Sequence, residues 1–191
     1  MAGTETSAST LSWALYRLAA NPNLVDQIRS EVDALPSDRL SISAYRKELP
    51  ATLNFVSETL RMYPAIWMSS RTSVSTIMLG SNSFQAGTDF FFSSYQLQHD
   101  PRTFESPEIF SPERWSGQLP LSSRPGFTPF SGGGRKCIGD RFAVYEILHV
   151  LIAIVRRWEV SLVSPGTAIK PRRLAANLTP ERLFLRIDKR P

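Results

Sequence analysis

Apolar residues recur every three or four positions through the first third of the chain, which predicts helices rather than strands. We expect one helix over residues 5–20 and a second beginning at Asn21-Pro22, because asparagine caps a helix and proline fits its first turn. A third helix is expected to end before Pro64. The apolar stripes of the three helices are, in chain order, Leu11, Leu15 and Leu18; Leu24, Val25, Ile28, Val32 and Leu35; and Leu53, Val56 and Leu60.

From Pro64 onward the pattern changes to short apolar runs between turn residues, which predicts small strands. Two such strands are expected at residues 77–79 and 89–92. Residues 99–130 are rich in proline and aromatic residues and have no period, so they predict a long irregular loop. A predicted loop of that length inside a compact domain is usually either functional or wrongly assigned.

A last long helix is predicted from about Gly139 to Trp158, followed by an alternating tail that is typical of a terminal hairpin. These patterns together predict a mainly α-helical chain with small β-sheets. The helix is expected to turn Phe142, Leu148, Leu151, Ile152 and Val155 inward, and the tail alternates at Val160, Leu162, Leu183, Leu185 and Ile187.

Composition limits the kinds of site that the chain can form. Its 191 residues, 42% apolar and 20% charged, suit one ordinary domain with a packed core or a large half of something bigger. The single cysteine, Cys137, excludes a disulfide framework and any multi-thiolate zinc or iron–sulfur site. The net charge of +5 comes from residues 156–191, which hold nine Lys and Arg against three acidic residues. No aromatic residues alternate with these cations, and no zinc-finger or helix-turn-helix spacing is present, so nucleic-acid binding is not expected.

Cys137 lies between a triple glycine and the start of the most apolar helix. Free backbone N–H groups, the helix dipole and the adjacent cations Arg135 and Lys136 would stabilise a thiolate there. A phosphatase loop is excluded, because the sixth residue after the cysteine is Ala143 rather than arginine. Two interpretations remain: a buried, inert cysteine, or a thiolate that binds one metal centre from one side.

The loop from Phe130 to Gly139, FSGGGRKCIG, closely resembles the haem-binding loop of the cytochrome P450 family of haem-thiolate monooxygenases. The resemblance implies that haem b (iron protoporphyrin IX) is the cofactor and that Cys137 is the axial ligand of its iron. It further implies that Arg135 pairs with a haem propionate and that Phe130 packs beside the sulfur. Gly133 and Gly139 would allow the tight backbone of this loop.

Two further segments resemble the same family. Glu58-Thr-Leu-Arg61 is similar to its Glu-x-x-Arg helix, and Pro112-Glu113-Arg114-Trp115 is similar to the segment whose arginine joins that pair. The resemblance implies a buried Glu58–Arg61–Arg114 network that braces the loop of Cys137 as a scaffold. Without the resemblance, a glutamate and an arginine three residues apart would indicate a surface pair worth ~0–1 kcal/mol.

The start of the chain, Ala2-Gly3-Thr4-Glu5-Thr6, resembles the oxygen-activation stretch of the family's long distal helix. The resemblance implies that the small pair Ala2-Gly3 leaves room for dioxygen and that Thr6 hydrogen-bonds the oxygen being activated. Glu5 would help to deliver protons. An ordinary capped helix start is the alternative for five residues of this composition.

Three looser assignments follow from the same resemblance. Arg71 stands where family members place a second propionate ligand. Residues 65–67 (Ala65, Ile66 and Trp67) and residues 175–178 (Ala175 to Leu178) are candidates for the substrate wall. A plain core strand and a surface turn are the respective alternatives for these two stretches.

The resemblance implies that residues 1–191 are the C-terminal part of one P450 catalytic domain, from the oxygen-activation helix through the cysteine loop to the C-terminal hairpin. Because family members carry a large portion before that helix, the expected fold is an N-terminally truncated P450 fold. The expected function is a monooxygenase that inserts one oxygen atom of O2 into a small, apolar organic substrate. The alternative is a truncated, catalytically inactive fragment of such an enzyme.

The resemblance also implies an electron-donating reductase or ferredoxin-type partner. Lys136 and Arg141 are candidates for its docking surface, whereas plain solvated charge is the alternative for Arg172, Arg173 and Lys189. The most apolar stretch, residues 144–155, is too short to cross a bilayer and gives no membrane anchor. The location therefore stays open, although a full-length eukaryotic relative would be expected on the endoplasmic reticulum membrane.

Overall fold

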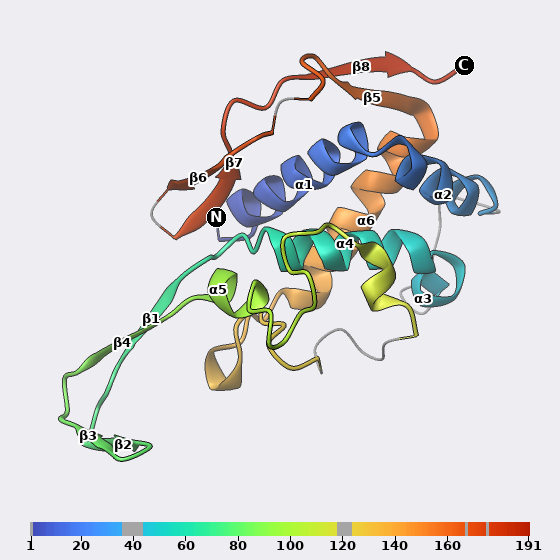
Figure 1. The fold of residues 1–191 in the computed structure, drawn as a ribbon. Helices are drawn as coiled ribbons and strands as arrows, with labels where there is room; N and C mark the ends of the chain where they lie inside the picture. The colour runs from blue at the N-terminus through green and yellow to red at the C-terminus, as the bar shows by residue number, and fades with distance from the viewer. Residues whose placement is uncertain (1, 36–43, 118–123, 167, 175) are drawn as a thin grey trace.

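The computed structural model describes residues 2–35, 44–117, 124–166, 168–174 and 176–191, and Figure 1 shows their arrangement. It is mainly α-helical with small antiparallel sheets, as the sequence predicts. In chain order the elements are α1 (Ala2–Ala20), α2 (Pro22–Asp33), α3 (Ala44–Glu48), α4 (Pro50–Met62), β1 (Ser69–Thr72), β2 (Ile77–Leu79), β3 (Asn82–Phe84), β4 (Asp89–Phe92), α5 (Ser94–Gln98), the 3-10 helices η1 (Pro112–Trp115) and η3 (Gly133–Arg135), α6 (Asp140–Arg157), β5 (Trp158–Leu162), β6 (Pro171–Leu174), β7 (Asn177–Pro180) and β8 (Leu185–Lys189).

The helical core forms where α6 contacts α1, α2 and α4. Each of these four helices contributes an apolar stripe, and most of the residues expected on those stripes are buried. Asn21 lies at the N-cap of α2, as predicted, but its side chain does not cap that helix. Its amide instead donates to the carbonyl of Arg17 at 2.7 Å, and this bond fixes the turn between α1 and α2.

The N-terminus of α4 is closed by a residue that the sequence did not single out. The carboxylate of Glu31, on α2, accepts hydrogen bonds from the backbone N–H groups of Ala51 and Thr52 at 2.6 and 2.8 Å. These N–H groups have no partner inside their own helix, and a negative charge is favourable at a helix N-terminus. Glu31 therefore ties α2 to the helix that carries Glu58 and Arg61.

One expected inward residue of the last helix is placed wrongly by the sequence pattern. Leu148, Leu151, Ile152 and Val155 are buried, but Phe142 is 70% exposed. Successive residues of an α-helix turn by about 100°, so Phe142 lies on the opposite side of α6 from Leu151. Phe142 lies three residues after Gly139, where the cysteine loop ends, and its side chain is exposed on the first turn of α6.

The expected strands at 77–79 and 89–92 are present as β2 and β4. Their antiparallel partners, β3 and β1, are short and polar and gave no strand pattern in the sequence. The four strands form an arm that extends away from the helices (Figure 1).

The alternating tail forms a paired β5 and β8, with Val160 opposite Ile187. It is not a simple hairpin, because the β6–β7 pair is inserted between the two strands. Ile187 is 54% exposed, so the alternation there does not mark a buried face.

The segment 99–130 is irregular over its described residues apart from the short η1, as predicted. Its course is fixed by three buried aromatic side chains, Phe104, Trp115 and Phe127, which join the main core. This apolar anchoring places the irregular segment against α4 and leads the chain into the cysteine loop (Figure 1). Among the described residues, no helix combines the length and the apolar character needed to span a bilayer.

Candidate cofactor site

Main-chain hydrogen bonds fix the loop that carries Cys137. The N–H of Cys137 donates to the carbonyl of Phe130 at 3.0 Å, and the N–H of Lys136 donates to the carbonyl of Gly133 at 3.1 Å. Gly133 has a φ of +66°, which residues with a side chain rarely adopt. Cys137 itself is exposed and precedes the first residue of α6, Asp140, by three positions. Its N–H is thus used within the loop rather than left free as the sequence suggested.

The two cations next to Cys137 have different surroundings. Arg135 is exposed at the end of η3. Lys136 forms an ion pair with Asp140 at 2.5 Å, and this hydrogen bond lowers the pKa of Asp140. The expected docking cation Lys136 is therefore already paired, whereas Arg141 is exposed on the first turn of α6.

The residues around Cys137 fit a flat metal cofactor better than a bare metal ion. Ile138, the residue after Cys137, and Phe142, on the first turn of α6, have exposed apolar side chains. A Cβ on Gly133 would meet no atom within 4 Å, and one on Gly139 would lie 3.9 Å from the Cys137 sulfur. Within the part of the chain that the structure describes, no group of three His, Cys, Asp or Glu side chains could chelate an ion. One thiolate beside an apolar surface suits a metal that brings its other ligands with it, as haem does.

The start of α1 makes polar contacts with two distant elements. Glu5 accepts a hydrogen bond from the side-chain amide of Asn177, at the start of β7, at 2.9 Å. Ser7 is buried and donates to the carboxylate of Glu146, on α6, at 2.6 Å. Thr6 lies between them and its hydroxyl is 3.4 Å from the carbonyl of Gly3. The predicted oxygen-activation stretch is thus tied to β7 through Glu5, and Ser7, the residue after this stretch, ties the same helix to α6.

The two stretches expected to form the substrate wall lie side by side. Ile66 pairs with Asn177 in an antiparallel bridge, and the N–H of Trp67 donates to the carbonyl of Ala176 at 3.1 Å. The carbonyl of Leu178 accepts from both Ser9 and Trp13 of α1, at 2.6 and 3.0 Å. Ala175, the first residue of the second stretch, lies outside the described residues.

Arg71 is exposed on β1, away from the helical core. Its guanidinium donates to the carbonyl of Ser70 at 2.7 Å and lies 5.3 Å from the ring centre of Phe92. Both contacts lie within the β1–β4 pair, so the Arg71 side chain lies on the arm formed by strands β1 to β4.

Glu58 and Arg61 form a doubly hydrogen-bonded ion pair on α4, and both side chains have 0% exposure. Two guanidinium nitrogens of Arg61 donate to the two oxygens of Glu58, each at 2.9 Å. Nη1 of Arg61 donates to the carbonyl of Gln98 at 2.8 Å, and Nη2 donates to the carbonyl of Pro107, also at 2.8 Å. Arg61 therefore connects α4 to the irregular segment.

The second arginine, Arg114, reaches the same carboxylate. Its Nε donates to Oε1 of Glu58 at 3.0 Å, and the indole N–H of Trp115 donates to Oε2 at 2.9 Å. The backbone N–H of Ser111 adds a bond to Oε1 at 3.0 Å. Burial alone would raise the pKa of Glu58. The hydrogen bonds from Arg61, Ser111 and Trp115, together with the positive charge of Arg61, outweigh the effect of burial and lower that pKa.

A family model for cytochrome P450 matches residues 1–185 of the chain. The chain belongs to the cytochrome P450 family. Cytochrome P450 is a haem-binding family, and haem b is its general cofactor. The fold, with its long helices and small antiparallel sheets, agrees with this membership.

Curated relatives of this P450 chain include bacterial and plant proteins. Cyclooctatin synthase of Streptomyces melanosporofaciens is 38% identical over 173 residues, which cover 90% of this chain and 38% of that protein. Cyclooctat-9-en-7-ol 5-monooxygenase of the same organism is 36% identical over 170 residues, with 88% and 37% covered. Protein LUTEIN DEFICIENT 5, chloroplastic, of Arabidopsis thaliana is 34% identical over 194 residues, with 100% and 33% covered. The chain thus spans 33 to 38% of the length of these relatives.

The P450 scaffold includes polar residues that the sequence did not single out. Trp115 directly follows Arg114 in the segment Pro112–Trp115. Its indole N–H is a hydrogen-bond donor, and its place beside Arg114 is the sequence signal that points to a role at the buried ion pair. Arg124 donates to the carbonyl of Arg114 at 2.9 Å and lies 4.7 and 4.9 Å from the ring centres of Phe104 and Trp115. Gln98 is fully buried, and no local pattern marks it as different from the exposed Gln96.

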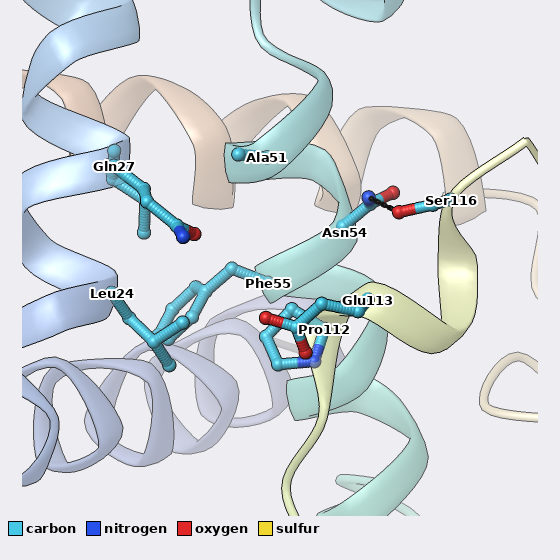
Figure 2. A pocket seen from close by; sticks show the side chains of 9 residues that line it. Leu24, Gln27, Ala51, Asn54, Phe55, Pro112, Glu113 and Ser116 are labelled. Atoms are coloured by element: carbon cyan, nitrogen blue, oxygen red, sulfur yellow. Dashed lines mark hydrogen bonds between the residues drawn. The ribbon is translucent and has the colours of Figure 1, made fainter.

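Two hollows lie outside the cysteine loop of this P450 chain. An open groove of about 980 Å³ runs between α1 and the β7–β8 region, and Glu5 and Asn177 lie on its wall. A smaller pocket of about 110 Å³ lies between α2, α4 and η1, with Leu24, Phe55 and Pro112 around it (Figure 2). Asn54 and Ser116 are hydrogen-bonded across one side of this pocket at 3.3 Å. The groove is of the size that small-molecule sites have, whereas the pocket has room for only a few water molecules.

Replacing Trp115 by phenylalanine tests the indole bond to Glu58. We expect the free energy of unfolding to fall by ~1.5–3 kcal/mol, because the bond ends on a buried charged group. Urea denaturation followed by circular dichroism measures the change. Trp158→Phe is the matched control, because Trp158 is 41% exposed on β5. An equal loss in both variants would contradict a specific role for the indole N–H.

Proposed function

We propose that this chain holds the thiolate side of a monooxygenase site, with Cys137 as the axial ligand of haem iron. When bound, the haem supplies O2 activation, in which one oxygen atom enters an organic substrate and the other is reduced to water. The observation that supports this most directly is that Cys137 is exposed while its backbone N–H is held by the carbonyl of Phe130, in a segment that also exposes the apolar Ile138 and Phe142.

The residues of the loop would have separate tasks at such a site. Cys137 would ligate the iron, and Ile138 and Phe142 would keep water from the sulfur by covering it with apolar surface. The exposed guanidinium of Arg135 would pair with one propionate, and Arg71 with the second. Phe130 would contribute its carbonyl, which holds the N–H of the ligand residue.

The start of α1 would serve oxygen activation rather than iron ligation. Thr6 would hold a proton at its hydroxyl, and Glu5 would pass protons from solvent at its carboxylate. Gly3 lies in open surroundings, since a Cβ there would meet no atom within 4 Å. The paired stretches around Ile66 and Asn177 lie near this helix start and would form part of the substrate wall.

The substrate class and the redox partner follow from the same proposal. A relative named as a monooxygenase, cyclooctat-9-en-7-ol 5-monooxygenase, supports oxygen insertion into a small, largely apolar organic molecule. Electrons would come from a reductase or ferredoxin-type protein, with the exposed Arg141 near the cysteine loop as a docking cation.

The test is the spectrum of the reduced, CO-bound chain after expression with a supply of haem. We expect a stable thiolate-type Soret band, because Cys137 is exposed and held in place without the cofactor. A chain that binds no haem, or that gives only a band of the non-thiolate type, would contradict the proposal. Measuring product from an added substrate then separates a working monooxygenase from the inactive alternative, which would show the band without turnover.

A further inference from the structure

Gln98 is the last residue of α5, and its side chain has 0% exposure. A glutamine amide carries two N–H donors and one carbonyl acceptor, and buried polar groups are costly unless they are hydrogen-bonded. Both donors and the acceptor of Gln98 have partners in the structure, and these partners belong to two segments far apart in the chain.

The donors of Gln98 complete the C-terminus of α4. Nε2 donates to the carbonyls of Leu60 and Arg61, at 3.0 and 2.7 Å. The last carbonyls of a helix have no hydrogen-bond donor within it. In a continued helix the carbonyl of Leu60 would accept from the N–H of residue 64, but Pro64 has no N–H. Gln98 therefore supplies the hydrogen-bond donors that the carbonyls of Leu60 and Arg61 lack at the end of α4.

The acceptor of Gln98 holds the segment that leads into the cysteine loop. Its Oε1 accepts from the backbone N–H of Thr128 at 2.9 Å. The carbonyl of Thr128 in turn accepts from Ser94 at 3.0 Å and from the N–H of Ser131 at 3.1 Å. Phe130, between these two residues, provides the carbonyl that holds the N–H of Cys137.

Gln98 is also joined to the buried ion pair through its main chain. Its carbonyl accepts from Nη1 of Arg61 at 2.8 Å. One residue therefore connects the guanidinium of Arg61, the end of α4 and the anchor of the cysteine loop. The Glu58–Arg61 pair has no equally short connection to that loop among the described hydrogen bonds.

We propose that Gln98 is a positioning residue that fixes the cysteine loop, and with it Cys137, relative to the Glu58–Arg61 pair. The effect of Gln98 on iron ligation by Cys137 rests on the proposed function. Its hydrogen-bonded connection between α4 and Thr128 does not require haem. A purely structural amide would stabilise the whole fold equally, while a positioning residue acts selectively on residues 126–139.

The test compares Gln98→Leu with Gln96→Leu, since Gln96 lies on the same helix and is exposed. Amide hydrogen exchange is measured on the full chain without haem. In Gln98→Leu we expect exchange in residues 126–139 to be about tenfold faster, because the Thr128 anchor loses its acceptor. Exchange in α1 and α6 and the control variant should stay close to the wild type. Acceleration spread evenly over the chain, or an unchanged loop, would overturn the proposal.

A second arm measures the reduced, CO-bound spectrum of the same variants with haem. In Gln98→Leu we expect a smaller share of thiolate-type Soret absorbance and a faster loss of that band with time. If the wild type shows no such band, the proposed function fails, but the exchange result still decides the role of Gln98. If Gln98→Leu does not fold, Gln98→Met replaces it, because a flexible thioether fills the same space without hydrogen bonds. Ser94→Ala, which removes the other side-chain anchor of Thr128, should accelerate exchange in the same residues.

Discussion

Cys137→Ser is expected to abolish the thiolate-type Soret band of the haem-loaded, reduced, CO-bound chain. A serine hydroxyl stays protonated near neutral pH and lacks the electron-rich sulfur that gives a thiolate complex its character. The loop itself should keep its shape, because the bond that fixes residue 137 runs from its backbone N–H to Phe130. We therefore expect Cys137→Ser to lose the thiolate-type band completely and to change the free energy of unfolding only slightly.

The control for this experiment is a change in the same loop that spares the thiol. Ser131 has a φ of 60°, so Ser131→Gly relieves backbone strain and leaves Cys137 untouched. We expect Ser131→Gly to retain the band. The ligand assignment would be wrong if Cys137→Ser kept the same thiolate-type band as the wild type.

Glu58→Gln is expected to lower the free energy of unfolding by ~3–5 kcal/mol, since it leaves two buried or nearly buried arginines without their anion. The glutamine has almost the same size, so the loss would come from charge and hydrogen bonding rather than from a cavity. Urea denaturation followed by circular dichroism measures the change, with the exposed Glu48→Gln as the matched control. A loss below ~1 kcal/mol would show that the pair behaves as an ordinary surface ion pair.

The same carboxylate gives the protein a pH dependence. Because the pKa of Glu58 is lower in the folded chain than its ordinary value of 4.5, its stabilising contribution is present above that value. The contribution is lost as the pH falls from there through the pKa of the folded state. In Glu58→Gln the free energy of unfolding should therefore fall less steeply as the pH is lowered. The difference in free energy of unfolding between the variant and the wild type should become smaller at low pH. An unchanged difference between the two proteins from pH 7 to pH 3 would contradict this assignment.

The parts of the fold that the sequence predicts well are those set by local periodicity. The helices ending near Ala20 and before Pro64 follow from apolar spacing and proline, and both are present. Phe142 was placed wrongly because a large aromatic residue at the start of an apolar helix was counted with its stripe, although it lies on the far side. Strands β1 and β3 were missed because their residues are polar and their pairing depends on strands elsewhere in the chain.

At the candidate site, family resemblance identified the charged residues, whereas neutral donors and acceptors were missed. Glu58, Arg61 and Arg114 stand in recognisable segments, and the structure brings their side chains together. Gln98 and the N–H of Ser111 carry no local signal, because their importance comes from what lies across from them in space. The roles of Cys137, Arg135, Arg71, Thr6 and Glu5 toward haem and oxygen stay predictions for the experiments above.

The single carboxylate of Glu58 also has a consequence for the order of folding. Its partners Ser111, Arg114 and Trp115 lie 53, 56 and 57 residues further along the chain. A nascent α4 can form locally, but its Glu58–Arg61 face can be dehydrated only after that distant segment has closed a long loop. We expect the docking of this segment to be a late step, so that changes at Ser111–Trp115 act mainly on the unfolding rate and leave the folding rate almost unaltered.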